Sequence, residues 1–261
     1  MHRSTRPAAV LVPVALACAA CGKKDDAHVA PAASALAAST ADAAATVWRY
    51  TIDPTSVART DMQGVKEHIV GDASAAAGTL DVVPSDLAQS RGTVRIDLTT
   101  FATHTFHDDK DATQTKHART WLEVQVGDAT NEAMRWAELA IRSIDAASAT
   151  DLAKVTPTRD GGDDVRTVTM TVHGDLLIHG HRTHEDVPVE VAFRYPAGAA
   201  ADSKPARIAV ATKEPMRVVL KEFDVRPRDP AGVALAWTTN LVAKVADVAN
   251  VTVDLNASPT P

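Results

Sequence analysis

Apolar and polar residues alternate with a period of two along most of this chain. In "TVRIDLTTF" (93–101), valine, isoleucine and leucine alternate with threonine, arginine and aspartate, and 168–180 and 187–195 show the same pattern. A period of two is typical of a strand with one buried face. Shorter segments of this type bring the expected number of strands to eight or more, separated by turns such as "RDGGDD". The sequence therefore predicts an all-β domain, an antiparallel barrel or sandwich.

One region departs from this alternation. Residues 108–124 are polar and helix-permissive, and residues 128–136 begin with a plausible helix cap at Asp128 or Thr130. We therefore expect one or two short helices, inserted between strands, that cover one end of a barrel.

The first residues have the pattern of a bacterial secretory leader. A basic start is followed by an apolar run over residues 8–20, which is too short to span a bilayer. The segment "AACG" around Cys21 resembles a lipobox, so we predict a signal peptide at 1–20 and lipidation at Cys21. Cleavage before Cys18, or an ordinary secreted protein, are the alternatives.

Composition sets the expected domain limits. Residues 21–46 are rich in alanine and have no apolar face, which favours an extended tether over a folded unit. Residues 47–257 have ordinary composition and suit one all-β domain, followed by a short tail at 258–261. No segment after the leader is apolar enough to cross a membrane.

The same composition excludes several function classes. Both cysteines lie within the first 21 residues, so the domain has no disulfide, thiolate nucleophile or cysteine-ligated metal. Removing residues 1–20 with their two arginines leaves 25 basic and 33 acidic residues, a net charge of −8, which argues against a nucleic-acid partner. The chain has no G-x-S-x-G or H-E-x-x-H motif, and we predict that it is not an enzyme.

The stretch "GDLLIHGHRTHEDVPVEV" (174–191) carries His179, His181 and His184, followed by Glu-Asp. In an extended strand His179 and His181 share a face, and His184 lies on the other, so the three do not converge as a metal requires. A second group of histidines and aspartates at 104–117 falls in a solvated loop. We predict a polar barrel rim and no metal site; a histidine-rich metal buffer is the competing hypothesis.

Four segments, taken in order, resemble the YceI-like family of periplasmic lipid-binding proteins. They are "YTIDP" (50–54), "AGTLDVVPSDLAQSRGTVRIDLTTFAT" (77–103), "KHARTWLEV" (116–124) and "VTMTVHGDLLIHGHRTHEDVPVEVAF" (168–193). The resemblance covers roughly residues 48–255. It implies an eight-stranded, antiparallel, lipocalin-like barrel that holds a long isoprenoid, such as a quinone tail, in its lumen, and it makes a homodimer plausible.

The resemblance also suggests roles for individual residues. His179 and Gly180 fall at the strand end and turn of the signature hairpin, whose connection covers 179–184. The chain departs from the family where His184 replaces a usual proline, where an aromatic pair is reduced to Trp121–Leu122, and where a late Asp-Phe-Gly segment becomes "EFDV".

The sequence does not decide whether the lumen is an empty channel or is filled by side chains. Ten aromatic residues in 261, against many Val, Leu, Ala and Ile, suit either a smooth apolar channel or a filled core. We predict that Trp121, Leu122, Met134 and Trp136 gate the lumen and contact the lipid, with plain packing as the alternative, and that Phe193 and Phe223 belong to the core. The expected protein is a periplasm-facing lipoprotein, with the outer membrane favoured, that binds a polyisoprenoid or isoprenoid quinone. The alternative is a structural or interaction module of the cell envelope with a filled barrel.

Overall fold

The structure, a computed structural model, describes residues 46–64, 68–200, 202–229, 231–235 and 246–261. The predicted signal peptide, the lipidation site at Cys21 and the tether lie outside the described residues. Within the described part of the chain, no helix has the length and apolar character that a bilayer crossing requires.

Most of the described residues belong to strands, as the alternating pattern predicts. In chain order these are β1 (Trp48–Ile52), β2 (Val57–Gln63), β3 (His68–Ala73), β4 (Ala77–Val82), β5 (Arg91–Asp97), β6 (Ala102–Thr103), β7 (Gln125–Val126), β8 (Ala129–Thr130), β9 (Trp136–Asp145), β10 (Thr158–Asp160), β11 (Asp163–Ile178), β12 (His181–Pro196), β13 (Arg207–Thr212), β14 (Met216–Val219) and β15 (Val248–Pro259).

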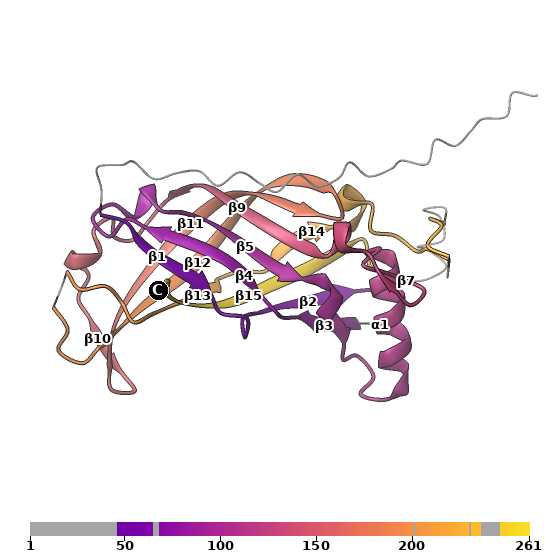
Figure 1. The fold of residues 1–261 in the computed structure, drawn as a ribbon, viewed down its shortest axis with the longest axis horizontal. Helices are drawn as coiled ribbons and strands as arrows, with labels where there is room; N and C mark the ends of the chain where they lie inside the picture. Colours follow the sequence, from indigo (N-terminus) through magenta and orange to yellow (C-terminus); the bar gives the residue numbers. More distant parts are fainter. Residues whose placement is uncertain (1–45, 65–67, 201, 230, 236–245) are drawn as a thin grey trace, which may run out of the picture.

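Eight of these strands close into a ring. They pair antiparallel in the order β1, β4, β5, β9, β11, β12, β13 and β15, and β15 pairs back with β1 (Figure 1). Strand β2, which follows β1 in the chain, also pairs with β15. Strand β3 pairs with β2, and β6 pairs with β3, so these strands extend the sheet. A closed ring leaves no long unpaired edge. The predicted antiparallel eight-stranded barrel is confirmed.

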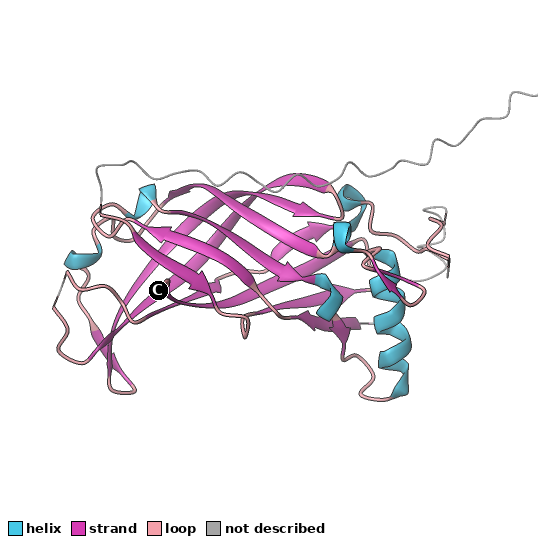
Figure 2. Ribbon diagram, viewed as in Figure 1, coloured by secondary structure: helices cyan, strands magenta, loops and turns pink. Residues whose placement is uncertain are grey.

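One helix, α1 (Asp109–Trp121), lies across one end of the barrel (Figure 2). The Asp108 carboxylate caps it by accepting a hydrogen bond from the Lys110 backbone at 2.8 Å. Thr115 Oγ1 accepts a hydrogen bond from the Thr103 backbone of β6, so α1 covers the short outer strand of the sheet. This agrees with the helix expected over 108–124.

The second expected helix does not form. Residues 128–136 contain β8, a single 3₁₀ turn (Glu132–Met134) and the start of β9. Asn131, and not Asp128 or Thr130, caps that turn. The turn cannot continue because Trp136 already pairs with Asp97 in the barrel wall.

Two expected boundaries also differ from the structure. The hairpin connection between β11 and β12 consists of His179 and Gly180 alone, both with positive φ (52° and 75°), as in a type I′ turn. His181 to His184 are therefore already in β12, and the connection is shorter than the predicted 179–184. At the other end, Ser258 and Pro259 are not a tail, because they pair with Thr51 and Tyr50 of β1.

An ion pair with a buried carboxylate joins β5 to the start of β9 near the α1 end. Asp97 Oδ2 accepts hydrogen bonds from Arg135 Nε and Nη2 at 2.9 and 2.7 Å, and Oδ1 accepts from the Thr99 backbone at 2.9 Å. Burial alone would raise the pKa of the Asp97 carboxyl, but hydrogen bonds from Arg135 and Thr99 outweigh it and lower the pKa below its usual value.

Asp97→Asn is therefore expected to lower the free energy of unfolding by about 1–2 kcal/mol at pH 7. Because the folded pKa is depressed, the stabilisation is present above the ordinary carboxyl pKa and is lost as the pH falls through the folded value. Urea unfolding at pH 7 and pH 3 measures both effects. An equal difference between the two proteins at both pH values would contradict this account.

Candidate functional site

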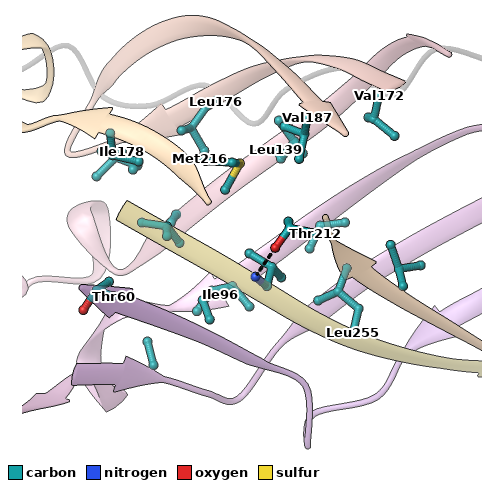
Figure 3. A pocket seen from close by; sticks show the side chains of 18 of the residues that line it. Thr60, Ile96, Leu139, Val172, Leu176, Ile178, Val187, Thr212, Met216 and Leu255 are labelled. Carbon is teal, nitrogen blue, oxygen red and sulfur yellow. Dashed lines mark hydrogen bonds between the residues drawn. The ribbon is translucent and has the colours of Figure 1, made fainter. Parts of the chain in front are cut away.

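The barrel encloses a cavity of about 440 Å³. Its lining comes from α1 and from strands all around the ring, and opposite walls face each other across it (Figure 3). This volume lies within the roughly 300–1,000 Å³ of sites that bind small molecules. The barrel is therefore not filled by its own side chains.

The cavity is long. On β11 the lining runs from Met170 to Ile178, and the eight residue steps between them span about 26 Å at the rise of an extended chain. With a usual barrel-strand tilt of roughly 35–45°, this corresponds to about 20 Å along the barrel axis. The space has the proportions of a tube.

The wall is almost entirely aliphatic, and its threonines do not change this. Thr212 Oγ1 accepts a hydrogen bond from the Val253 backbone at 3.1 Å, and Thr60 Oγ1 donates one to the Gly71 carbonyl at 3.2 Å. Because these hydroxyls are paired with the backbone, they offer little to a polar ligand. The wall therefore suits a chain without polar atoms along its length.

Helix α1 closes one end of the cavity with one face. Its lining residues follow the i, i+3, i+4, i+7, i+8 spacing of a single helix face: Gln114, His117, Ala118, Trp121 and, directly after the helix, Leu122. Gln114 Oε1 is buried without a hydrogen-bond partner. The α1 end thus combines apolar contacts with a polar atom that a ligand could satisfy.

The opposite part of the barrel, toward β10, contains two buried tyrosines. Tyr50 and Tyr195 are fully buried there, and Tyr50 donates a hydrogen bond to the Pro205 carbonyl at 3.1 Å. The Arg166 guanidinium lies 4.7 Å from the centre of the Tyr195 ring. Burial raises the pKa of Tyr50 far above its usual range, so the phenol stays neutral. These side chains fill part of the barrel at this end.

A charged network fixes the α1 end. His179 is buried, with Nδ1 2.9 Å from the Phe223 carbonyl oxygen and Nε2 2.5 Å from Glu123 Oε2. Arg228 Nη1 lies 3.0 Å from Glu123 Oε1. The hydrogen bond from His179, aided by the charge of Arg228, lowers the pKa of Glu123 against the opposing effect of burial. The network joins the β11–β12 turn, the segment after α1 and the chain around Phe223.

The structure separates the predicted lipid contacts into two groups. Trp121 and Leu122 line the cavity, whereas Met134 and Trp136 do not. Trp136 lies between the guanidinium groups of Arg95 and Arg135, 4.7 and 5.0 Å from its ring centre. Met134 and Trp136 lie outside this cavity because Met134 ends the 3₁₀ turn and Trp136 begins β9, so neither belongs to a helix that covers the barrel.

Sequence reasoning missed most of the wall. The lumen-facing residues are the apolar members of the alternating strands, among them Val172, Val189 and Leu255. Alternation identifies them as inward-facing, but it does not distinguish lumen from packed core. Phe193 and Phe223 are buried as expected, and Phe193 also lines the cavity. Gln114 and His117 could have been found from the helical spacing that they share with Trp121.

Residues 50–257 match the model of the YceI-like domain. The chain belongs to the YceI-like family. No curated protein matches it.

Two solved structures resemble this YceI-like domain at low identity. BcnA of Burkholderia cenocepacia is 16% identical, with 78% of this chain and 96% of BcnA covered and a TM-score of 0.49. A polyisoprenoid binding domain from Saccharophagus degradans, implicated in plant cell wall breakdown, is 14% identical, with 81% and 98% covered and a TM-score of 0.48.

Proposed function

We propose that this YceI-like domain binds one long apolar lipid of the polyisoprenoid or isoprenoid-quinone class in its lumen. The observation that carries the proposal is the tube-like cavity of about 440 Å³ with its aliphatic wall. Branched Val, Leu and Ile side chains match the methyl branches of an isoprenoid in size and polarity. The open cavity favours this function over an envelope module with a filled barrel.

The energetics of transfer explain what such a protein does. Each buried CH₂ is worth about 0.8 kcal/mol against water, so a long lipid rarely leaves a bilayer unaided. Transfer from the bilayer to an aliphatic lumen exchanges one apolar environment for another and is nearly neutral. Sequestration or transport of the lipid, without chemistry on it, follows from these two statements.

The ligand's polar end belongs at α1. The unpaired Gln114 Oε1 would accept a hydrogen bond from the hydroxyl of a polyprenol or of a reduced quinone, and His117 lies one turn further along the same helix face. The aliphatic remainder of the tube receives the tail. The ligand is thus a lipid with one small polar terminus.

The same proposal includes the anchor predicted from the sequence. A lipid on Cys21 would hold the domain at a membrane of the cell envelope, and the tether of about 25 residues predicted from the sequence would have a root-mean-square span of roughly 25–30 Å. Tethering replaces diffusional encounter with a high effective concentration of the lumen at the bilayer surface.

The test is to purify the chain from bacterial membranes, extract it with organic solvent and analyse the extract by mass spectrometry, alongside native mass spectrometry of the intact protein. We expect about one isoprenoid lipid per chain. Protein that repeatedly yields no lipid, and that takes up none from vesicles containing isoprenoid quinone, would overturn the proposal. Mass spectrometry of the N-terminal peptide tests acylation of Cys21 separately.

A further inference from the structure

The outer face of the barrel carries a cluster of histidines and aspartates that the lumen does not use. In the β11–β12 register, His173 stands opposite Asp186, and Asp175 stands opposite His184. These positions alternate with the lumen-lining Val172, so their side chains lie on the outside. The antiparallel pairing therefore places two imidazoles and two carboxylates next to one another on the outer face of the barrel.

Both imidazoles approach the same carboxylate. Asp186 Oδ1 lies 2.6 Å from His173 Nδ1 and 3.5 Å from His184 Nε2. The two rings are stacked nearly parallel, with their centres 6.4 Å apart. One donor atom from each of the three residues lies within 4.8 Å of the other two.

The far nitrogen of each ring faces a further carboxylate. His173 Nε2 lies 3.0 Å from Asp145 Oδ2 of β9, and His184 Nδ1 lies 3.7 Å from Asp175 Oδ1. The His173–Asp145 contact matches the carboxylate–histidine–metal arrangement, in which the outer carboxylate orients the ring and makes its other nitrogen a better ligand. The Asp175 carboxylate is too far from His184 for a hydrogen bond and accepts one from Arg142 Nε at 2.8 Å instead.

The distances suit a small transition-metal ion. Bonds of 2.0–2.2 Å in a tetrahedral site place neighbouring donor atoms about 3.3–3.6 Å apart. The His184–Asp186 distance already falls in this range. The His173–Asp186 contact must open by about 1 Å, and the Asp186 side chain, 63% exposed, is free to move.

We propose that His173, His184 and Asp186 bind a divalent transition-metal ion, Zn²⁺ or Cu²⁺, with Asp145 orienting the His173 imidazole. Two imidazoles with a carboxylate are a donor set that both ions accept. Three protein ligands on an exposed face leave a coordination position for water or an exchanging ligand. The site is independent of the lumen and of the proposed lipid.

A second group with similar composition does not fit. His179, His181 and Asp224 also bring donor atoms together. His179, however, is buried with one nitrogen at the Phe223 carbonyl and the other at Glu123, so a metal would have to break the network that closes the α1 end. His181→Gln therefore serves to separate the two groups.

The test is isothermal titration of the untagged, full-length chain with Zn²⁺. His173→Gln and His184→Gln are each expected to remove one Zn²⁺-binding equivalent or to raise the Kd of the proposed site for Zn²⁺ at least tenfold. Asp145→Asn is expected to raise it about 10–100-fold. His181→Gln is the first control. The second uses the exposed pair of His68 and Asp61, whose Nε2 and Oδ1 atoms lie 2.8 Å apart, and consists of His68→Gln and Asp61→Asn.

Zn²⁺ binding elsewhere in the chain is common to all variants and cancels in the comparison. Electron paramagnetic resonance of added Cu²⁺ supplies the second readout, with nitrogen splitting from two imidazoles in the parent chain and from one after His184→Gln. Circular dichroism checks that each variant is folded. Unchanged stoichiometry and affinity in both histidine variants, or an equal loss in the His68→Gln control, would overturn the proposal.

Discussion

Val253→Trp is expected to abolish lipid binding while the barrel remains folded. Val253 lines the cavity from β15 and is only partly buried, because the open lumen leaves part of its side chain uncovered. An indole at this position would occupy the space that the lipid tail needs. We expect the amount of extracted lipid per chain to fall at least tenfold, as measured by mass spectrometry after exchange with vesicles that contain isoprenoid quinone.

The matched control is Val70→Trp. Val70 lies on β3 next to the lumen-lining Ile69, and its side chain faces the outer surface instead. It adds the same ring to the protein without entering the cavity, so lipid binding should persist. Overpacking typically costs about 1–3 kcal/mol, and thermal unfolding reports whether Val253→Trp stays folded. If it does not, the smaller Val253→Phe repeats the test. A folded Val253 variant that keeps its full lipid content would place the ligand outside the lumen.

Glu123→Gln is expected to lower the free energy of unfolding by about 2–3 kcal/mol at pH 7. The carboxylate is the shared partner of the buried His179 and of Arg228, whose side chain is only 7% exposed. A neutral amide would remove the negative charge that His179 and Arg228 share, and it would leave Arg228 with the Asp224 carboxylate, 3.2 Å away, as its remaining acidic partner. Urea unfolding measures the loss, and we also expect faster release of bound lipid because the network fixes the α1 end.

The pH dependence follows from the depressed pKa of Glu123. Its stabilisation is fully present above the ordinary carboxyl pKa, near pH 4.3, and it disappears as the pH falls through the lower folded value. The difference between the parent chain and Glu123→Gln should therefore shrink toward pH 3.

Glu132→Gln is the control for the Glu123 prediction. Glu132 pairs with Arg135 at 3.1 Å, but its side chain is 68% exposed, and exposed pairs contribute little. Equal destabilisation by the two substitutions would contradict a special role for the buried network.

Local patterns predicted much of the architecture. Alternation in segments such as 187–195 identified strands, because a half-buried strand must alternate, and the family resemblance supplied the barrel. The helix at 108–124 was also foreseen. Residues 128–136 were misread as helix because a capping side chain signals only the start of a turn. Whether the turn continues depends on the partner of Trp136, which lies some forty residues earlier in the chain.

The candidate metal site also combines residues that local sequence patterns indicate with one that only the strand register reveals. His179, His181 and His184 attracted attention because they are close in the sequence, and the predicted separation of His184 from the other two agrees with its place on the outer face. His173 was not considered, although it is the residue that the register brings to His184 and Asp186. Cross-strand neighbours are set by register, which depends on the length of the turn at His179 and Gly180.

By itself, the sequence determined that the domain is all-β and free of cysteine, and that its strands have one apolar face, because these properties depend on each residue and its near neighbours. Only the tertiary structure decided that those apolar faces enclose a tube instead of a packed core. The free volume depends on the circumference of the closed ring, on how far side chains from opposite walls reach, and on where Tyr50 and Tyr195 fill the barrel, and these are distances between residues far apart in the chain.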